Sequence, residues 1–266
     1  MNAFNYSGKQ KVYLYWIMGY GILLFTIAAF FLWRYKGRVN KKNTSVEIHN
    51  IALMKNHRGK VFGIDVSQYQ GNIHWEMVDL IYDEFPVDFI FIRATMGAEG
   101  KDRKFEHNWS EAFKQNKLRG AYHYFRPKEK GLQQANNFIK NVKLTSEDLP
   151  PVLDIEEHLK IMTAADWKNL KAELKIWLDI VEAHYGIRPI VYSPDTYFTH
   201  FLEKEFKNYV LWIANYNIKR RKSPKEHWNF WQFSEKGKVS GIVGAVDLNM
   251  FCGNISDLQK LRKKKE

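Results

Sequence analysis

The chain has 266 residues, 45% of them apolar and 15% aromatic, which is enough for one sizeable domain or two small ones. Its net charge of +12 lies mainly in the ends. Residues 1–60 hold ten basic residues and one acidic residue, and residues 260–266 hold five basic residues and one acidic residue. Residues 61–259, by contrast, hold 26 basic and 27 acidic residues. The nearly neutral middle argues against a nucleic-acid-binding domain, which would carry a basic face on the fold itself. The single cysteine, Cys252, excludes an intramolecular disulfide and a cysteine-only metal site.

The first long segment without charge is residues 12–33. At about 1.5 Å per helical residue, these 22 positions are long enough to cross a hydrocarbon core of roughly 30 Å. Aromatic residues lie near both ends, as at membrane interfaces. A cleaved signal peptide would have a shorter apolar run and a small-residue cleavage site. The sequence therefore predicts an N-terminal tail over residues 1–11 and an uncleaved transmembrane helix over residues 12–33.

The segment that follows, residues 34–60, is basic and polar with little apolar periodicity, and it is predicted to be a stalk near the membrane. More basic residues flank the helix on this side than on the other, which by the positive-inside rule would place the remainder in the cytoplasm. Translocating the short tail alone would be unusual, and the substrate argued below lies outside the cell. We therefore expect a single-pass protein of the inner membrane whose catalytic domain, residues 61–266, is extracytoplasmic.

Eight short, mostly apolar runs in residues 61–266 predict β-strands, because parallel strands buried on both faces read as continuous apolar segments. These runs are Val61–Val66, Phe89–Ala94, Gly120–Phe125, Pro151–Ile155, Pro189–Ser193, Val210–Ala214, Phe230–Phe233 and Val246–Met250. Several of them end in a polar residue. In a barrel of parallel strands the active site lies at the carboxyl ends of the strands, so these polar residues are the first candidates for a site.

Helical patterns lie between the first five strands, over Trp75–Tyr82, His107–Lys117, Leu132–Val142 and Ala164–Tyr185, the last followed by Gly186 as a stop signal. Alternation of strands and helices indicates a parallel sheet. After the fifth strand the intervals shorten and helical signals fade. The predicted fold is therefore α/β, a modified TIM-like barrel of the form (β/α)5(β)3 whose last three strands are joined mainly by loops.

Carboxylates mark the ends of three of these strands. Asp65 lies in the first, Asp154 and Glu156 end the fourth, and Asp247 is in the eighth. An acid in or beside a buried strand is costly unless it is paired or catalytic. Asp154 and Glu156 are two residues apart and so point to the same side of an extended strand. Such crowding raises one pKa and leaves an acid beside a base, which is what glycoside hydrolysis requires.

Two other interpretations of these acids stay open at the level of single residues. An Asp at a strand end is often only a cap for the following loop. Alternatively, the same acids could bind a divalent metal, with His123 or His158 as further ligands, although a single His near a strand end is more often a hydrogen-bonded structural residue.

Several motifs together resemble the glycoside hydrolase family 25 lysozymes. They occur in the expected order over about 190 residues and leave out the predicted helix and stalk. The motifs are Gly63-Ile64-Asp65-Val66-Ser67-Gln68-Tyr69-Gln70-Gly71, Phe91-Ile92-Arg93-Ala94-Thr95, Gly120-Ala121-Tyr122-His123-Tyr124, Pro151-Val152-Leu153-Asp154-Ile155-Glu156, Leu211-Trp212-Ile213-Ala214, Trp231-Gln232-Phe233-Ser234 and Val246-Asp247-Leu248-Asn249. One departure is Met96, where family members often carry an acid.

The resemblance implies an N-acetylmuramidase that cleaves the β-1,4 bond between N-acetylmuramic acid and N-acetylglucosamine of peptidoglycan without metal or cofactor. It implies Glu156 as general acid, Asp154 as the group that stabilises charge or orients the substrate's acetamido group, and Asp65 and Asp247 as further members of an acidic pocket. Residues expected to contact the sugar lie near strand ends, and they are Tyr69, Tyr124, Tyr192, Trp212 and Gln232.

Tryptophan within a barrel strand is usually a packing residue, so Trp212 and Trp231 each have a structural alternative. Two alternatives to the whole function also remain. One is a glycan-binding module without turnover, which the intact Asp154 and Glu156 argue against, and the other is a chitinase-like barrel hydrolase that would cleave chitin and leave peptidoglycan intact.

Overall fold

The computed structural model describes residues 45–156, 163–217 and 223–262, together with residues 21, 24, 25 and 27. Apart from those four positions, the predicted transmembrane helix at 12–33 lies outside the described residues, as do the predicted tail, residues 34–44 of the stalk, and His158. Within the described part of the chain, no helix combines the length and the apolar character needed to cross a membrane. This finding overturns the predicted inner-membrane location, which we withdraw.

Residues 49–266 form one compact unit, which includes the last part of the predicted stalk. Residues 49–56 are helical, with Leu53 and Met54 buried. Asn50 is also buried, and its amide donates hydrogen bonds to the hydroxyls of Tyr82 (2.8 Å) and Ser234 (2.9 Å). The difference from the predicted stalk has a local reason: the apolar contacts of this segment with the domain come from Ile51, Leu53 and Met54, a run too short to give a periodic apolar pattern.

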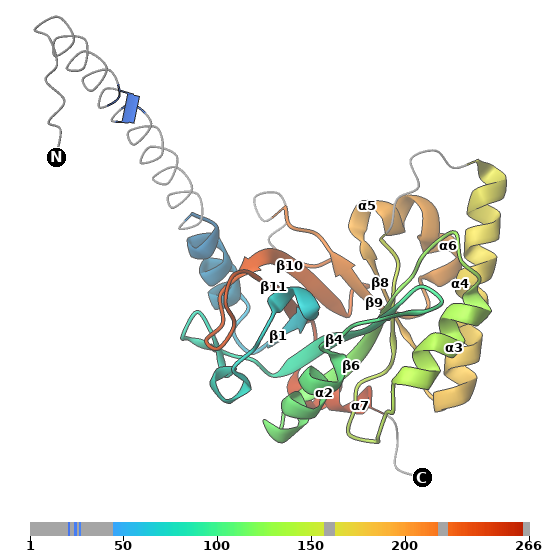
Figure 1. Ribbon diagram of the computed structural model, residues 1–266, viewed down its shortest axis with the longest axis horizontal. Coiled ribbons are helices and arrows are strands. Elements are labelled where there is room, and N and C mark those ends of the chain that lie inside the picture. The colour runs from blue at the N-terminus through green and yellow to red at the C-terminus, as the bar shows by residue number, and fades with distance from the viewer. Residues whose placement is uncertain are drawn as a thin grey trace, which may run out of the picture. The chain divides into compact units, whose positions relative to one another are not determined.

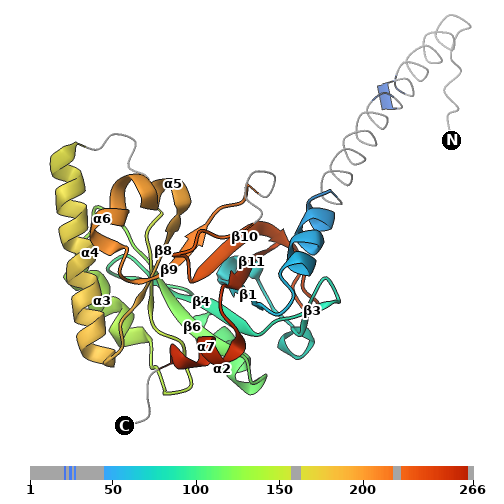
Figure 2. The ribbon, with the colours of Figure 1, turned by 180° about the vertical axis from the view of Figure 1, so that it is seen from behind.

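A closed barrel of eight strands forms the centre of this unit (Figures 1 and 2). Around the barrel the order is β1 (Val61–Val66), β4 (Phe89–Met96), β6 (Leu118–Tyr124), β7 (Val152–Asp154), β8 (Ile190–Pro194), β9 (Val210–Ala214), β10 (Phe230–Gly237) and β11 (Val246–Phe251), with β1 and β4 paired to complete the ring. Short strands β2 (Leu80–Ile81) and β3 (Phe85–Pro86) pair with each other, and β5 (Gly100–Lys101) pairs with the end of β4. The predicted α/β barrel is confirmed.

The sheet is mixed because β11 runs antiparallel to both of its neighbours, β1 and β10, whereas the other neighbouring barrel strands are parallel. As a result, the first residues of β11 lie at the same end of the barrel as the carboxyl ends of the parallel strands. Asp247, the second residue of β11, is paired in register with Asp65 near the end of β1.

The helices cover the outside of the barrel. The main ones are α2 (Phe105–Lys114), α3 (Gly131–Asn141) and α4 (Ala164–Tyr185), and α3 and α4 lie side by side in both views (Figures 1 and 2). The C-terminal α7 (Ile255–Lys260) instead packs its buried Leu258 against the cluster inside the barrel. Helix α4 has the bounds that its sequence predicts. It begins at a capping box in which Thr163 and Asp166 satisfy each other's backbone N–H groups, and it ends at Gly186, whose φ of 69° is left-handed.

Two connections differ from the prediction. Trp75–Met77 is only a short 3-10 turn, followed by β2, where a helix over Trp75–Tyr82 was predicted. Tyr82 and Asp83 have positive φ angles of 52° and 55°, which end any helical course. Between β8 and β9 the chain forms α5 (Asp195–Tyr197), a π-helical turn (Phe198–Leu202) and α6 (Glu203–Phe206), where a loop was predicted.

The interior of the barrel is filled with aromatic rings beneath its open end. Phe91 stacks on Trp212 with ring centroids 4.5 Å apart, and Phe230 meets Phe91 edge-on at 5.3 Å. Gly120 makes room for this cluster, because a Cβ there would lie 2.6 Å from the ring of Phe91. Barrel strands thus place alternate residues inside, and the packed rings close the barrel below the site described next.

Candidate active site

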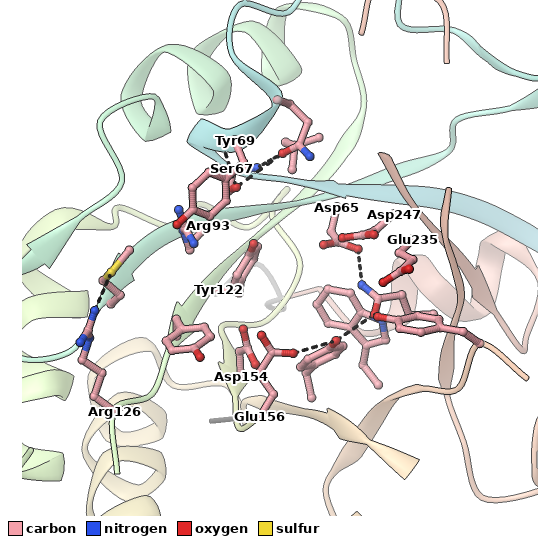
Figure 3. A pocket seen from close by; sticks show the side chains of 18 residues that line it. Asp65, Ser67, Tyr69, Arg93, Tyr122, Arg126, Asp154, Glu156, Glu235 and Asp247 are labelled. Atoms are coloured by element: carbon pink, nitrogen blue, oxygen red, sulfur yellow. Dashed lines mark hydrogen bonds between the residues drawn. The ribbon is translucent and has the colours of Figure 1, made fainter. Parts of the chain in front are cut away.

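A cavity of about 740 Å³ opens where the carboxyl ends of the parallel strands meet the start of β11 (Figure 3). All nine residues that the sequence singled out for catalysis or sugar contact line this cavity. The lining consists of Asp65, Val66, Ser67, Tyr69, Gln70, Arg93, Met96, Tyr122, Tyr124, Arg126, Asp154, Glu156, Tyr192, Trp212, Tyr216, Gln232, Glu235 and Asp247.

Asp154 and Glu156 lie at the centre of the cavity, where β7 ends (Figure 3). Asp154 is 5% exposed, and its Oδ1 has no hydrogen-bond partner among the described residues. Burial raises the pKa of Asp154 well above its usual range, and the negative charges of Glu156 and Asp65 raise it further. The pKa of Glu156 is raised too, first by burial and then by Asp65. The pair therefore resists losing both protons.

Asp65 and Asp247 form a second carboxyl pair across the β1–β11 register. Asp65 Oδ2 accepts hydrogen bonds from Gln232 Nε2 at 2.7 Å and from Asn249 Nδ2 at 2.8 Å, and these donors partly offset the burial that raises the pKa of Asp65 to about 6. Burial and the charge of Asp65 raise the pKa of Asp247 to about 9. At neutral pH, therefore, Asp247 is protonated and Asp65 carries the charge.

Gln232 connects the two carboxyl pairs. Its Nε2 donates to Asp65, while its Oε1 accepts from the hydroxyls of Tyr192 at 2.8 Å and Tyr216 at 2.6 Å. The Tyr192 hydroxyl is also 3.5 Å from Glu156 Oε2. A phenol has one proton to donate, and the shorter contact directs it to Gln232. Glu156 is therefore left with a weak hydrogen bond at most, in keeping with its raised pKa.

The aromatic residues of the cavity fall into two groups. Tyr192 and Trp212 are buried in the floor, where Trp212 Nε1 donates to Asn249 Oδ1 at 2.8 Å. Tyr69, by contrast, is 76% exposed at the opening and can receive the face of a sugar ring. Trp231 is fully buried and does not line the cavity. It packs with the outer core, and its Nε1 donates to the Asn215 carbonyl at 3.0 Å. Trp231 is therefore a packing residue, as expected of a tryptophan within a barrel strand.

His123 is buried outside the cavity, between the barrel and its helices. Its ring nitrogens contact Thr95 Oγ1 at 2.7 Å and Gln134 Oε1 at 3.0 Å, and the ring stacks on Trp177. Burial lowers the pKa of His123 to about 4, so the residue is neutral. These contacts make it a structural histidine. Among the described residues, no group of His, Cys, Asp and Glu has the arrangement of a metal-ion site.

Several lining residues were not among the predicted site residues, chiefly Arg93, Arg126, Tyr122 and Glu235. Arg93 left a signal in the sequence, because a charged residue interrupts the otherwise apolar run of β4. Its Nε donates to Asp102 Oδ2 at 3.0 Å, and its guanidinium lies 4.8 Å from the centre of the Tyr69 ring. Arg126 follows β6 in a loop whose sequence has no distinguishing pattern.

Comparisons with known proteins agree with this geometry. A family model described as "Glycosyl hydrolases family 25" matches residues 64–242. The Escherichia coli K12 protein named "Uncharacterized protein YegX" is 38% identical over 200 residues, which cover 75% of this chain and 72% of that protein. Lysozyme M1 of Streptomyces globisporus is 32% identical over 214 residues, which cover 76% of this chain and 71% of that lysozyme. A family 25 glycosyl hydrolase structure from Bacillus anthracis is 31% identical with a TM-score of 0.66, covering 76% of this chain and 94% of that one.

Proposed function

The chain belongs to glycosyl hydrolase family 25, and we propose from this premise that it is a lysozyme that hydrolyses bacterial peptidoglycan. The bond cleaved is the β-1,4 bond between N-acetylmuramic acid and N-acetylglucosamine. Membership of the family makes the chain a glycoside hydrolase, and the 32% identity to Lysozyme M1 supports peptidoglycan as the substrate. The cavity of about 740 Å³ has room for sugar rings on both sides of the scissile bond.

The observation that carries the proposal is the Asp154–Glu156 pair at the end of β7. Burial raises both pKa values; the charge of Glu156 raises that of Asp154 further, and the charge of Asp65 raises that of Glu156. The pair therefore keeps a proton under conditions where an ordinary carboxyl group has lost it. Asp154 is the more deeply buried of the two. Glu156 lies nearer the opening, and a proton given to the substrate passes through it. We assign Glu156 as the general acid that protonates the leaving oxygen.

Asp154 has the complementary role. When Glu156 holds the proton, Asp154 is the ionised member, and its unpartnered Oδ1 can face the positive charge that develops on the sugar or accept the substrate's acetamido N–H. Its burial strengthens this interaction, because charges attract more strongly where water is excluded. A water molecule then completes hydrolysis, and Glu156, now ionised, is placed to take a proton from it.

The remaining residues hold this pair and the sugar in place. Gln232 accepts the hydroxyls of Tyr192 and Tyr216 and donates to Asp65, so that the floor of the cavity is a single hydrogen-bonded unit. Tyr69 and Tyr124 form walls against which sugar faces can stack. Asp247, which is protonated at neutral pH, limits the negative charge that would otherwise gather beside Asp65.

Digestion of purified peptidoglycan by the full chain tests the proposal, with mass spectrometry of the soluble products. We expect fragments that end in a reducing N-acetylmuramic acid. Fragments that end in reducing N-acetylglucosamine would reject the assigned bond. Binding without release, by a protein shown to be folded, would favour a glycan-binding module, and cleavage of chitin alone would favour a chitinase-like enzyme.

A further inference from the structure

The cavity is divided by charge. Its described lining contains two basic residues, Arg93 and Arg126, and both lie on the side formed by β4 and the end of β6 (Figure 3). Asp65, Asp247 and Glu235 lie on the opposite side, and the Asp154–Glu156 pair lies between the two groups. A glycan that crosses Asp154 and Glu156 therefore meets acidic groups on one side and arginines on the other.

Arg93 presents a buried hydrogen-bond donor at this basic side. Its side chain is 7% exposed, and its Nη2 has no partner among the described residues. Asp102, which holds the Arg93 Nε, also accepts the backbone N–H groups of Gln68 (2.8 Å) and Lys104 (2.9 Å) and so fixes the guanidinium firmly. A buried donor without an acceptor is costly. An oxygen atom of a bound ligand would remove that cost.

Arg126 supplies net positive charge at the edge of the cavity. Its side chain is 46% exposed, and its Nη2 contacts the Met96 thioether at 3.4 Å, which is a weak acceptor. The nearest carboxylate oxygen belongs to Glu129, at 4.0 Å from Arg126 Nε, and the other oxygen of Glu129 is engaged by the Ala98 N–H at 2.5 Å. The guanidinium therefore keeps donors and charge available to a ligand.

We propose that Arg93 and Arg126 form a carboxylate-binding subsite that selects glycan strands by the acidic substituent of muramic acid. Arginine suits this chemistry because its planar guanidinium matches a carboxylate. The lactyl group of muramic acid carries a free carboxylate, or a stem peptide with carboxylates of its own, whereas N-acetylglucosamine carries neither. Arg93 would supply the fixed donor and Arg126 the attractive charge. The inference rests on the proposed function, since it concerns the glycan in that same cavity.

Three matched substrates test the subsite with the full chain. The first is glycan strands freed of peptides by an amidase, so that each lactyl carboxylate is free. The second is the same strands after coupling to methylamine, which converts each carboxylate to a neutral amide. The third is strands that still carry their stem peptides. We expect the amidated strands to have a KM about three- to tenfold higher than the better of the two charged substrates at low salt, with little change in kcat.

Four variants locate the effect. Arg126→Gln should remove most of this preference. Met96→Glu should do the same, because a carboxylate beside Arg126 would occupy it, whereas the neutral Met96→Gln should retain the preference. Lys128→Gln is the control for charge alone, since it removes a positive charge from the same exposed loop and does not line the described cavity.

The outcomes show whether the carboxylate belongs to the lactyl group or to the stem peptide, and they distinguish failure of the subsite from failure of the proposed function. A lower KM for free-lactyl strands would mean that the subsite binds the lactyl carboxylate, and a lower KM for peptide-bearing strands would mean that it binds the stem peptide. Equal KM values for charged and amidated strands in the unmodified chain would overturn the inference, as would an Arg126→Gln variant that behaves like Lys128→Gln. If no strand is cleaved, calorimetry measures the binding of the same strands. Tighter binding of charged strands that is lost in Arg126→Gln would then support the subsite, although the proposed function would have failed.

Discussion

Asp65 and Asp247 are paired in antiparallel register across β1 and β11, at the open end of the barrel. The reversed direction of β11 brings a second carboxyl group against the first, and burial keeps Asp247 protonated up to about pH 9. The hydrogen bond between the two carboxyl groups lowers the pKa of Asp65 and raises that of Asp247, so one proton is shared unequally. The site therefore contains a carboxylic acid that behaves as a neutral group at physiological pH.

The first prediction concerns stability against pH. The native state keeps the Asp247 proton that an unfolded chain, with a pKa near 3.8, has released, so the native state binds more protons and the free energy of unfolding falls as pH rises. His123 does not contribute above pH 7, since its pKa is about 4 when folded. The Asp247 proton makes the free energy of unfolding fall by about 1 kcal/mol per pH unit between pH 7 and 8.5, and Asp154, whose pKa is also raised, acts in the same direction.

Asp247→Asn should reduce that slope by about 1 kcal/mol per pH unit, because the neutral amide releases no proton, and between pH 7 and pH 8.5 the variant should gain about 1–2 kcal/mol of stability relative to the unmodified chain. Urea unfolding at several pH values measures both quantities. Asp257→Asn is the control, since this carboxylate at the start of α7 has a lowered pKa and should leave the slope unchanged. An unaltered slope in Asp247→Asn would show that Asp247 ionises normally.

Glu156→Gln should reduce kcat on peptidoglycan by about 10²- to 10⁴-fold, because an amide cannot protonate the leaving oxygen. The variant should fold normally and bind glycan strands as before, since the raised pKa of Glu156 means that its charge is not needed for stability. Reducing-end release measures turnover, and calorimetry measures binding. Glu111→Gln on α2, outside the described cavity lining, should retain full activity. Turnover above a tenth of the original rate would end the assignment of the acid.

Asp154→Asn should also lower kcat severely, by about 10²-fold or more, since charge stabilisation in a buried site is a large part of catalysis. Its KM should change less. At neutral pH the variant should be at least as stable as the unmodified chain, because burial and neighbouring charges disfavour the ionised form. Asp179→Asn, exposed on α4, controls for loss of an acid. If kcat fell less than about fivefold, Asp154 would be a structural residue.

Gln232→Leu should lower both stability and turnover. The substitution leaves the hydroxyls of Tyr192 and Tyr216 and the carboxylate of Asp65 without a shared partner. We expect about 2–4 kcal/mol of destabilisation in urea and at least a tenfold fall in kcat. Gln259→Leu, exposed on α7, should change neither quantity. A variant of normal stability would mean that the three groups find other partners.

The fold was predictable where local sequence decides the outcome. Buried parallel strands are continuous apolar runs, so β1 and β9 have the bounds that their runs predict, and the capping signals of Thr163 and Gly186 define α4. The direction of β11 was not predictable, because an apolar run carries no information about which way its strand points.

Contacts between distant residues account for most of what sequence analysis missed. Gln232 and Asp65 are 167 positions apart, and no local pattern indicates that they meet. Arg126 gains its role only because the chain after β6 passes beside Met96. The four carboxyl groups could be predicted, since acids at the ends of apolar strands are rare and costly. The support that uncharged residues give them could not: Gln232 and Tyr192 were expected to contact the sugar, and nothing local indicated that they hold the carboxyl groups.

The helical residues 49–56 provide the last prediction, because they are the first segment of the compact unit that holds the barrel. The buried Asn50 links this helix to Tyr82 and to Ser234 on β10, and both hydrogen bonds are lost if its side chain is shortened. We expect Asn50→Ala to lower the free energy of unfolding by about 1–3 kcal/mol, the cost of leaving buried polar groups unpaired. Asn56→Ala, exposed on the same helix, should change it by less than about 0.5 kcal/mol. Equal effects of the two substitutions in urea unfolding would mean that the helix contributes little to the stability of the barrel.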